Sequence, residues 1–154
     1  MAAVSRAREV GKAGLEVRAT RDRVLLRELL EQDRLFAAWS LVASMAMIDE
    51  STEDSWFAER LAQIEKTIHS APNAQRYAMN AAIIAIGCRS AALRKAAAAA
   101  SKRIGPVEID HGDTDCKTPV ATESLDKAWA HSKAKGFESP AAHERSRESM
   151  RTRC

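Results

Sequence analysis

The chain has 154 residues, of which 45% are hydrophobic and 29% charged, and its formal net charge is +3 at pH 7. This length suits one domain with a buried core, and the composition is that of a water-soluble globular protein. The sequence contains no apolar run of about eighteen residues and no apolar signal-like segment near its start. We therefore expect neither a membrane-spanning nor a secreted protein.

Three cysteines, Cys88, Cys116 and Cys154, are far apart, and none belongs to a CxxC pair. An odd number of isolated thiols excludes a disulfide framework, and the spacing does not fit a tetrahedral zinc site. We expect a protein of the reducing cytoplasm that carries no metal and no cofactor.

The N-terminal part divides into three segments. Residues 1–19 are polar and interrupted by glycine, and we expect a flexible lead-in. From Thr20, a candidate N-cap, the leucines gather on one side of a predicted surface helix: Leu25, Leu26, Leu29 and Leu30. Residues 35–48 are apolar on almost every side, which is typical of a helix in the middle of a core.

Two further helices are predicted before residue 90. Ser51 and Asp54 resemble a capping box, and the helix after them, to about His69, carries one apolar stripe: Phe57, Leu61, Ile64 and Ile68. Pro72 begins the next helix, which is again apolar nearly all round, and Gly87 is placed as the residue just past its end.

The C-terminal part contains two more predicted helices. Ser90 caps the first, which Gly105 and Pro106 end, and a polar loop with a possible extended stretch at Val107 and Ile109 follows. The second runs from about residue 120 to 135, before Gly136. Residues 137–154 are polar and arginine-rich, and we expect a disordered basic tail.

Amphipathic helices thus alternate with helices that are buried on nearly every side. The two buried helices also match at an offset of 40 positions, where Ala37–Ser40 aligns with Tyr77–Asn80. This period lies in the range of HEAT and armadillo repeats. We predict an all-α fold with a HEAT/armadillo-like α-α superhelix over residues 20–136. A compact helical bundle is the alternative.

The strings RYAMN, AIG, RIG-VE-DHG and CKTP follow one another between Arg76 and Ala121. In this order they resemble the C-terminal portion of the bacterial DNA alkylation-repair proteins, which are HEAT-like relatives of the alkylpurine DNA glycosylases. The resemblance covers roughly residues 35–135. The DHG…CKTP loop is its most specific element, because neither periodicity nor helix propensity would generate it.

The resemblance implies a helical solenoid whose basic concave face binds duplex, alkylated DNA without a metal. In the family's glycosylases a carboxylate and aromatic side chains lie beside the damaged base. Here the N-terminal repeats that hold the catalytic Asp are missing, and no aromatic residue stands at 80–82. We expect a truncated DNA-binding protein with weak or no glycosylase activity. The candidate carboxylates Asp33 and Asp49 look like helix caps, so no catalytic residue is assigned.

Several residues are candidates for DNA contact, and each has a structural alternative. Arg76 and Asn80 lie one turn apart and either face DNA or satisfy neighbouring helix ends. Lys95 and Lys102 share one helix face, where they bind phosphates or are merely solvated. The remaining candidates are Trp39, Arg103, His111 and Lys117. Trp39 is more typical of core packing than of base stacking.

The loop from Asp110 to Lys117 holds many potential ligand atoms. Its spacing fits neither a calcium loop nor a zinc site, and we favour turn capping over contact with nucleic acid. Cys116 lies close in sequence to Lys117 and His111, but no base that would activate it is visible.

A second function stays open: a non-catalytic helical-repeat scaffold that binds protein. If the stack is cut, the apolar face with Leu25 and Leu29 would be exposed and would pair with another chain or with a second copy.

Overall fold

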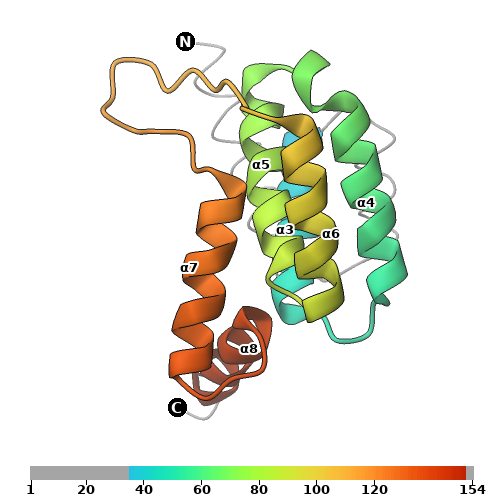
Figure 1. The fold of residues 1–154 in the computed structure, drawn as a ribbon, viewed down its shortest axis with the longest axis vertical. Helices are drawn as coiled ribbons and strands as arrows, with labels where there is room; N and C mark the ends of the chain where they lie inside the picture. The colour runs from blue at the N-terminus through green and yellow to red at the C-terminus, as the bar shows by residue number, and fades with distance from the viewer. Residues whose placement is uncertain (1–34, 152–154) are drawn as a thin grey trace.

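The computed structural model describes residues 35–151 (Figure 1). The predicted lead-in, the helix from Thr20 and its leucine stripe lie outside this span. The described part contains helices and no strand: α3 (Leu35–Ile48), α4 (Asp54–Thr67), the short 3-10 helix η1 (Ile68–Ser70), α5 (Asn73–Gly87), α6 (Ala91–Ile104), α7 (Ala121–Ala134) and α8 (Pro140–Arg151). The predicted extended stretch at Val107 and Ile109 forms no strand. None of the described helices combines the length and apolarity needed to cross a membrane.

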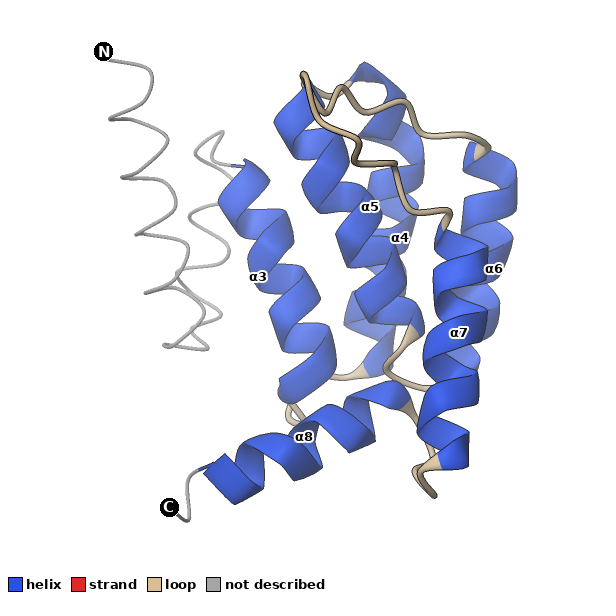
Figure 2. Cartoon of the chain, turned by 90° about the vertical axis from the view of Figure 1, so that its left-hand side faces the viewer, coloured by secondary structure: helices blue, strands red, loops and turns tan. Residues whose placement is uncertain are grey.

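The helices lie in two rows (Figure 2). Helix α3 packs most extensively against α5, and α7 adds to the other side of α5. Helices α4 and α6 pack against each other behind this row, and α6 also contacts α5 and α7. The prediction of an all-α fold is confirmed, and the two apolar helices are neighbours, as expected.

The core lies mainly between α3 and α5. Trp39 and Met45 of α3 and Met79 and Ile83 of α5 are at most 2% exposed. Helix α4 presents its predicted stripe to this core, and Phe57, Leu61 and Ile64 are buried. Burial of such side chains contributes about 1.5–3 kcal/mol each, which is why the apolar period decides the arrangement.

The helix ends agree with the sequence at some positions and differ at others. The Ser90 hydroxyl accepts the Leu93 N–H at 3.2 Å, and Gly105 ends α6 with a φ of 72°, as predicted. The predicted capping box is wrong, because the N-cap of α4 is Glu53, which makes no side-chain cap bond. The Ser51 hydroxyl instead donates to Asp49 within the preceding turn, at 2.7 Å.

Gly87 has a different role from the one predicted. It is the last residue of α5 rather than a residue past its end, and its φ is not positive. A Cβ built on Gly87 would lie 2.6 Å from Leu125 Cδ2 and 2.8 Å from Ala97 Cβ. The glycine is therefore needed because α6 and α7 approach the end of α5 closely.

The predicted disordered tail is also wrong for most of its length, since Pro140–Arg151 forms α8. Helix α8 crosses the end of α3 and also contacts α7 (Figures 1 and 2). Ala141 is fully buried, and its N–H donates to the Cys88 carbonyl at 3.1 Å. Arg145 forms an ion pair with Glu50 at 3.3 Å. The small buried residues at its start anchor this polar helix, although its composition alone suggests a solvated segment.

Arg89 connects the turn after α3 to the start of α4, a role that no local sequence pattern indicates. Its side chain is only 8% exposed. It donates to the carbonyls of Met45, Ala46, Asp49 and Thr52 and forms a 3.0 Å ion pair with Asp54. Its guanidinium also lies 4.4 Å from the centroid of the Phe57 ring. These bonds satisfy carbonyls at the C-terminal end of α3 and in the turn after it, where regular helical hydrogen bonding ends.

Candidate nucleic-acid interface

Three polar residues on one face of α5 hold the long loop between α6 and α7. The Asn73 side chain accepts the Asp110 N–H at 2.7 Å and donates to the Asp110 carbonyl at 2.8 Å. Arg76 donates to the Glu108 carbonyl at 2.8 Å, and Asn80 donates to the Pro119 carbonyl at 3.0 Å. Asn73, Arg76 and Asn80 are three and four residues apart, so they lie on one face of α5. Their partners belong to both arms of the loop, and both arms are therefore fixed to this face.

Arg76 and Asn80 are both engaged with the loop. Asn80 is 4% exposed, and Arg76 is half-buried with one nitrogen on a loop carbonyl. Both side chains donate to backbone carbonyls of the loop, whereas the structural alternative expected partners at neighbouring helix ends. Asn73, which completes the set, was not among the candidates, because its partners are 37 residues away.

Of the two loop candidates, His111 has partners in the fold, whereas Lys117 forms no hydrogen bond or ion pair within the described span. The His111 ring is 3.0 Å from the Thr118 hydroxyl and lies edge-on to the ring of Tyr77. The Asp110 side chain accepts the Gly112 N–H at 2.8 Å. Lys117 is exposed. The carboxylate of Asp110 therefore caps a turn, and no group of three or more metal-ligand side chains occurs among the described residues.

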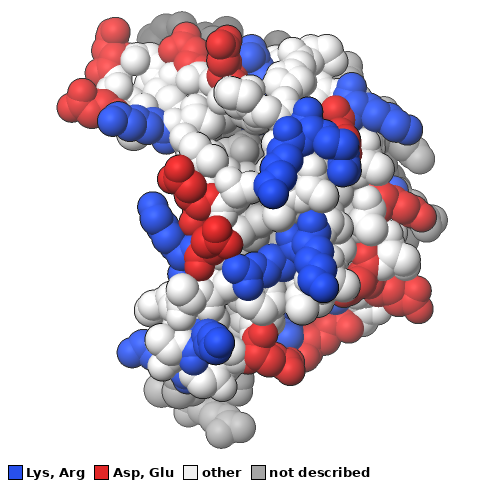
Figure 3. Space-filling model, in the orientation of Figure 1, with Lys and Arg blue, Asp and Glu red and all other residues white. Residues whose placement is uncertain are grey.

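Helix α6 carries the remaining basic candidates. Lys95 and Lys102 are both exposed, and the exposed positions around them on α6 include small residues: Ala91, Ala92 and Ala99. Neither lysine forms an ion pair with any residue of the described span. They are seven residues apart, which corresponds to about 10 Å along the helix axis. Figure 3 shows Lys and Arg side chains grouped over α6, with acidic side chains over α7 beside them.

The two arginines of the same helix are already paired. Arg103 binds Glu65 of α4 through two hydrogen bonds, at 2.6 and 3.0 Å. These hydrogen bonds lower the pKa of the Glu65 carboxyl and raise the pKa of Arg103. Arg94 pairs with Asp126 of α7 at 2.9 Å and lies over the Trp129 ring. The free positive charge of α6 therefore belongs to Lys95 and Lys102.

The eight predicted DNA-contact residues do not form one surface. Trp39 is 1% exposed in the core, and Arg76, Asn80 and His111 hold the loop. Lys95 and Lys102 share the exposed face of α6, whereas Arg103 is directed to α4 by Glu65. The spacing in the sequence identified the lysine pair. It could not show that Arg76 and Asn80 of α5 donate hydrogen bonds to the loop.

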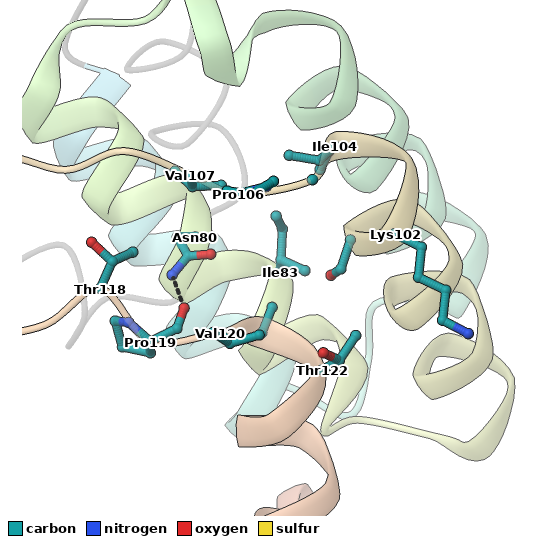
Figure 4. Close-up of a pocket in the computed structure, with 13 residues that line it drawn as sticks. Asn80, Ile83, Lys102, Ile104, Pro106, Val107, Thr118, Pro119, Val120 and Thr122 are labelled. Atoms are coloured by element: carbon teal, nitrogen blue, oxygen red, sulfur yellow. Dashed lines mark hydrogen bonds between the residues drawn. The ribbon is translucent and has the colours of Figure 1, made fainter.

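A cavity of about 410 Å³ lies beside this face, between α5, α6, the start of α7 and the two arms of the loop (Figure 4). Its walls are mainly aliphatic, with Ile83, Ile104, Val107 and Val120 among them. Asn80, Ser101 and Thr122 contribute polar groups, and Lys102 lies on its rim with the ammonium group directed away. No sequence pattern indicates this cavity, because its walls come from segments that are far apart in the chain.

Two carboxylates of the described span lie near helix ends and are engaged in contacts within the fold. Asp49 is buried and accepts hydrogen bonds from Ser51 and Thr52, so it holds the turn after α3 and does not cap a helix, because the N-cap of α4 is Glu53. Asp54 pairs with Arg89 and accepts a hydrogen bond from Ser90. No carboxylate lines the cavity. Asp33 lies outside the described residues.

The chain is similar to two bacterial proteins. It is 40% identical over 72 residues to the uncharacterized protein Lin0241 of Listeria innocua and 39% identical over 72 residues to the uncharacterized protein Lmo0209 of Listeria monocytogenes. Each match covers 46% of this chain and 32% of the relative, so the chain matches about a third of the length of these proteins. No family model matches the chain. No solved structure matches it significantly.

Proposed function

We propose that the protein binds the sugar–phosphate backbone of duplex DNA through the exposed face of α6, as a helical-repeat relative of the DNA alkylation-repair proteins. The observation that carries the proposal is the pair Lys95 and Lys102. Both are exposed, both lack a described carboxylate partner, and small side chains surround them. Lysine binds phosphate as a point charge, so this contact needs no precise geometry.

The shape of the face supports this partner. Alanines at 91, 92 and 99 allow a close approach of the α6 backbone. Phosphates of one strand follow each other about 3.4 Å apart along the duplex axis, so lysines about 10 Å apart reach the same backbone. Such contacts carry no base preference, and we expect binding that does not depend on sequence.

The two rows of helices support a HEAT-like arrangement as part of this proposal. In a stack of antiparallel helix pairs, the first helices of successive pairs form one layer and the second helices form another. Here α3 and α5 lie in one row, and α4 and α6 lie in the other. The match at an offset of 40 positions falls on α3 and α5, as this arrangement requires.

We expect little or no release of methylated purines from alkylated DNA. Cleavage of the glycosidic bond needs a carboxylate beside the sugar, where positive charge develops. Asp49 is engaged in hydrogen bonds of the turn after α3, and Asp54 is engaged in an ion pair with Arg89. An assay on alkylated duplex DNA tests this expectation, and robust release of methylated purines would contradict it.

Fluorescence anisotropy with a labelled duplex tests the binding itself. The variant Lys95→Gln/Lys102→Gln removes both charges of α6, whereas Lys135→Gln removes one exposed charge at the end of α7. We expect the double variant to lose most of its affinity and Lys135→Gln to stay close to wild type. Light scattering on the same samples tests the scaffold alternative. Self-association with no DNA binding would favour that alternative.

A further inference from the structure

We infer that the cavity between α5, α6 and α7 is a nucleotide-binding site, whose ligand places a base against the aliphatic wall and a phosphate at the start of α7. This inference rests on the proposed DNA binding, because Lys102 belongs both to the α6 face and to the cavity rim. Its volume of about 410 Å³ and its mainly apolar lining with few polar groups are typical of sites for small organic ligands.

The start of α7 supplies hydrogen-bond donors. Its N-cap is Val120, whose side chain forms no cap bond. The N–H groups of Ala121, Thr122 and Glu123 have no acceptor among the described residues, and Ala121 and Thr122 line the cavity. A helix N-terminus with free N–H groups favours a phosphate. Glu123 in the same turn is exposed and does not line the cavity.

Asn80 supplies an acceptor on the opposite wall. Asn80 is only 4% exposed, and its side-chain amide nitrogen donates to the Pro119 carbonyl. This bond orients the side-chain oxygen toward Ile83 and the cavity, as Figure 4 shows. The oxygen accepts no hydrogen bond from another residue of the described span. An acceptor that faces the cavity and is held in place in this way suits an amino or imino N–H of a base.

The remaining lining agrees with a nucleotide rather than with a free anion. The aliphatic side chains Ile83, Ile104, Val107 and Val120 would contact the faces of a flat ring. The Ser101 hydroxyl donates to the Ala97 carbonyl, so its oxygen is left to accept. Inorganic phosphate would use only the start of α7 and would leave both the apolar wall and Asn80 unused.

The test uses nuclear magnetic resonance of the full chain with deoxyadenosine monophosphate, inorganic phosphate and deoxyribose 5-phosphate as probes. We expect the mononucleotide to shift the Ala121 and Thr122 amide signals and the Asn80 side-chain signals, and to bind about tenfold or more tightly than either control. Equal binding of the three probes, or no shift with the mononucleotide at millimolar concentration, would overturn the inference.

Two variants localise the effect. Val120 is 55% exposed, so Val120→Trp fills the cavity mouth without disturbing the core, and Val120→Thr is its size-matched control. Thr122→Asp places a carboxylate where the phosphate would bind and also stabilises the helix start. We expect Val120→Trp and Thr122→Asp to weaken mononucleotide binding about tenfold or more and Val120→Thr to retain it.

Failure of this site and failure of the proposed function are distinguishable, because Lys95 is not part of the cavity. Lys95→Gln is expected to weaken duplex binding and to leave the mononucleotide shifts unchanged. If the duplex does not bind but the mononucleotide binds in the cavity, the site stands and the DNA proposal fails. If mononucleotide binding survives Val120→Trp unchanged, the site is wrong, whatever the duplex does.

Discussion

Replacement of Arg89 by Met tests how the turn after α3 is held. The guanidinium is 8% exposed, donates to four backbone carbonyls and pairs with Asp54. Methionine retains much of the side-chain volume but removes every one of these bonds. We expect unfolding at a lower temperature and lower denaturant concentration, with the helical content retained.

The loss of unfolding free energy depends on the backbone carbonyls and the Asp54 carboxylate that lose their partner in Arg89→Met. Each buried group without a partner costs about 1–3 kcal/mol, and breaking a buried ion pair costs about 3–5 kcal/mol. Asp54 is 44% exposed and remains solvated, which places the loss near the lower end, at about 3 kcal/mol. At about 2–4 °C per kcal/mol, the melting temperature should fall by roughly 10 °C.

Thermal and urea unfolding followed by circular dichroism measure this loss. Arg94→Met is the matched control, since Arg94 is 40% exposed and makes one ion pair with an exposed carboxylate. An exposed pair of this kind contributes at most about 1 kcal/mol. If Arg89→Met melts within about 2 °C of the wild type, the hydrogen bonds of Arg89 contribute little to the stability of the fold.

Three further predictions concern packing, thiol reactivity and the loop. Gly87→Ala should destabilise the fold by about 1–3 kcal/mol in urea unfolding, because its Cβ would overlap Leu125 and Ala97; an unchanged midpoint would contradict the close approach. Burial raises the pKa of Cys88 to about 11, so at pH 8 its thiolate fraction is small and iodoacetamide should modify exposed Cys116 first; equal rates by mass spectrometry would refute this. Asn73→Ala should speed proteolysis within residues 106–119 while changing the melting temperature little, and unchanged cleavage would show that this side chain does not hold the loop.

Local sequence signals predicted much of the fold. The apolar segment 35–48 is α3 with the predicted bounds, and Ser90 and Gly105 cap α6 as expected. These features depend on neighbouring residues, so sequence shows them directly. The capping box at Ser51 was wrong, and α8 was missed because its polar composition hides the buried contact of Ala141 with the end of α5.

The sequence predicted less of the candidate site, because its contacts join distant segments. Arg76 and Asn80 were visible as polar residues on an apolar helix, but their loop partners lie 32 and 39 residues away. Gly87 looked like a helix stop, whereas Leu125, 38 residues away, explains the glycine. Lys95 and Lys102 were placed correctly on one face because both belong to a single helix.

The salt dependence of duplex binding tests the central claim most directly. Each lysine that contacts a phosphate contributes a slope of about −0.9 to a plot of log K against log salt concentration. If Lys95 and Lys102 both bind phosphates, Lys95→Gln/Lys102→Gln should reduce the slope by about 1.8 relative to wild type, and Lys135→Gln should not change it. Equal slopes for the wild type and the double variant would contradict DNA binding by the face of α6.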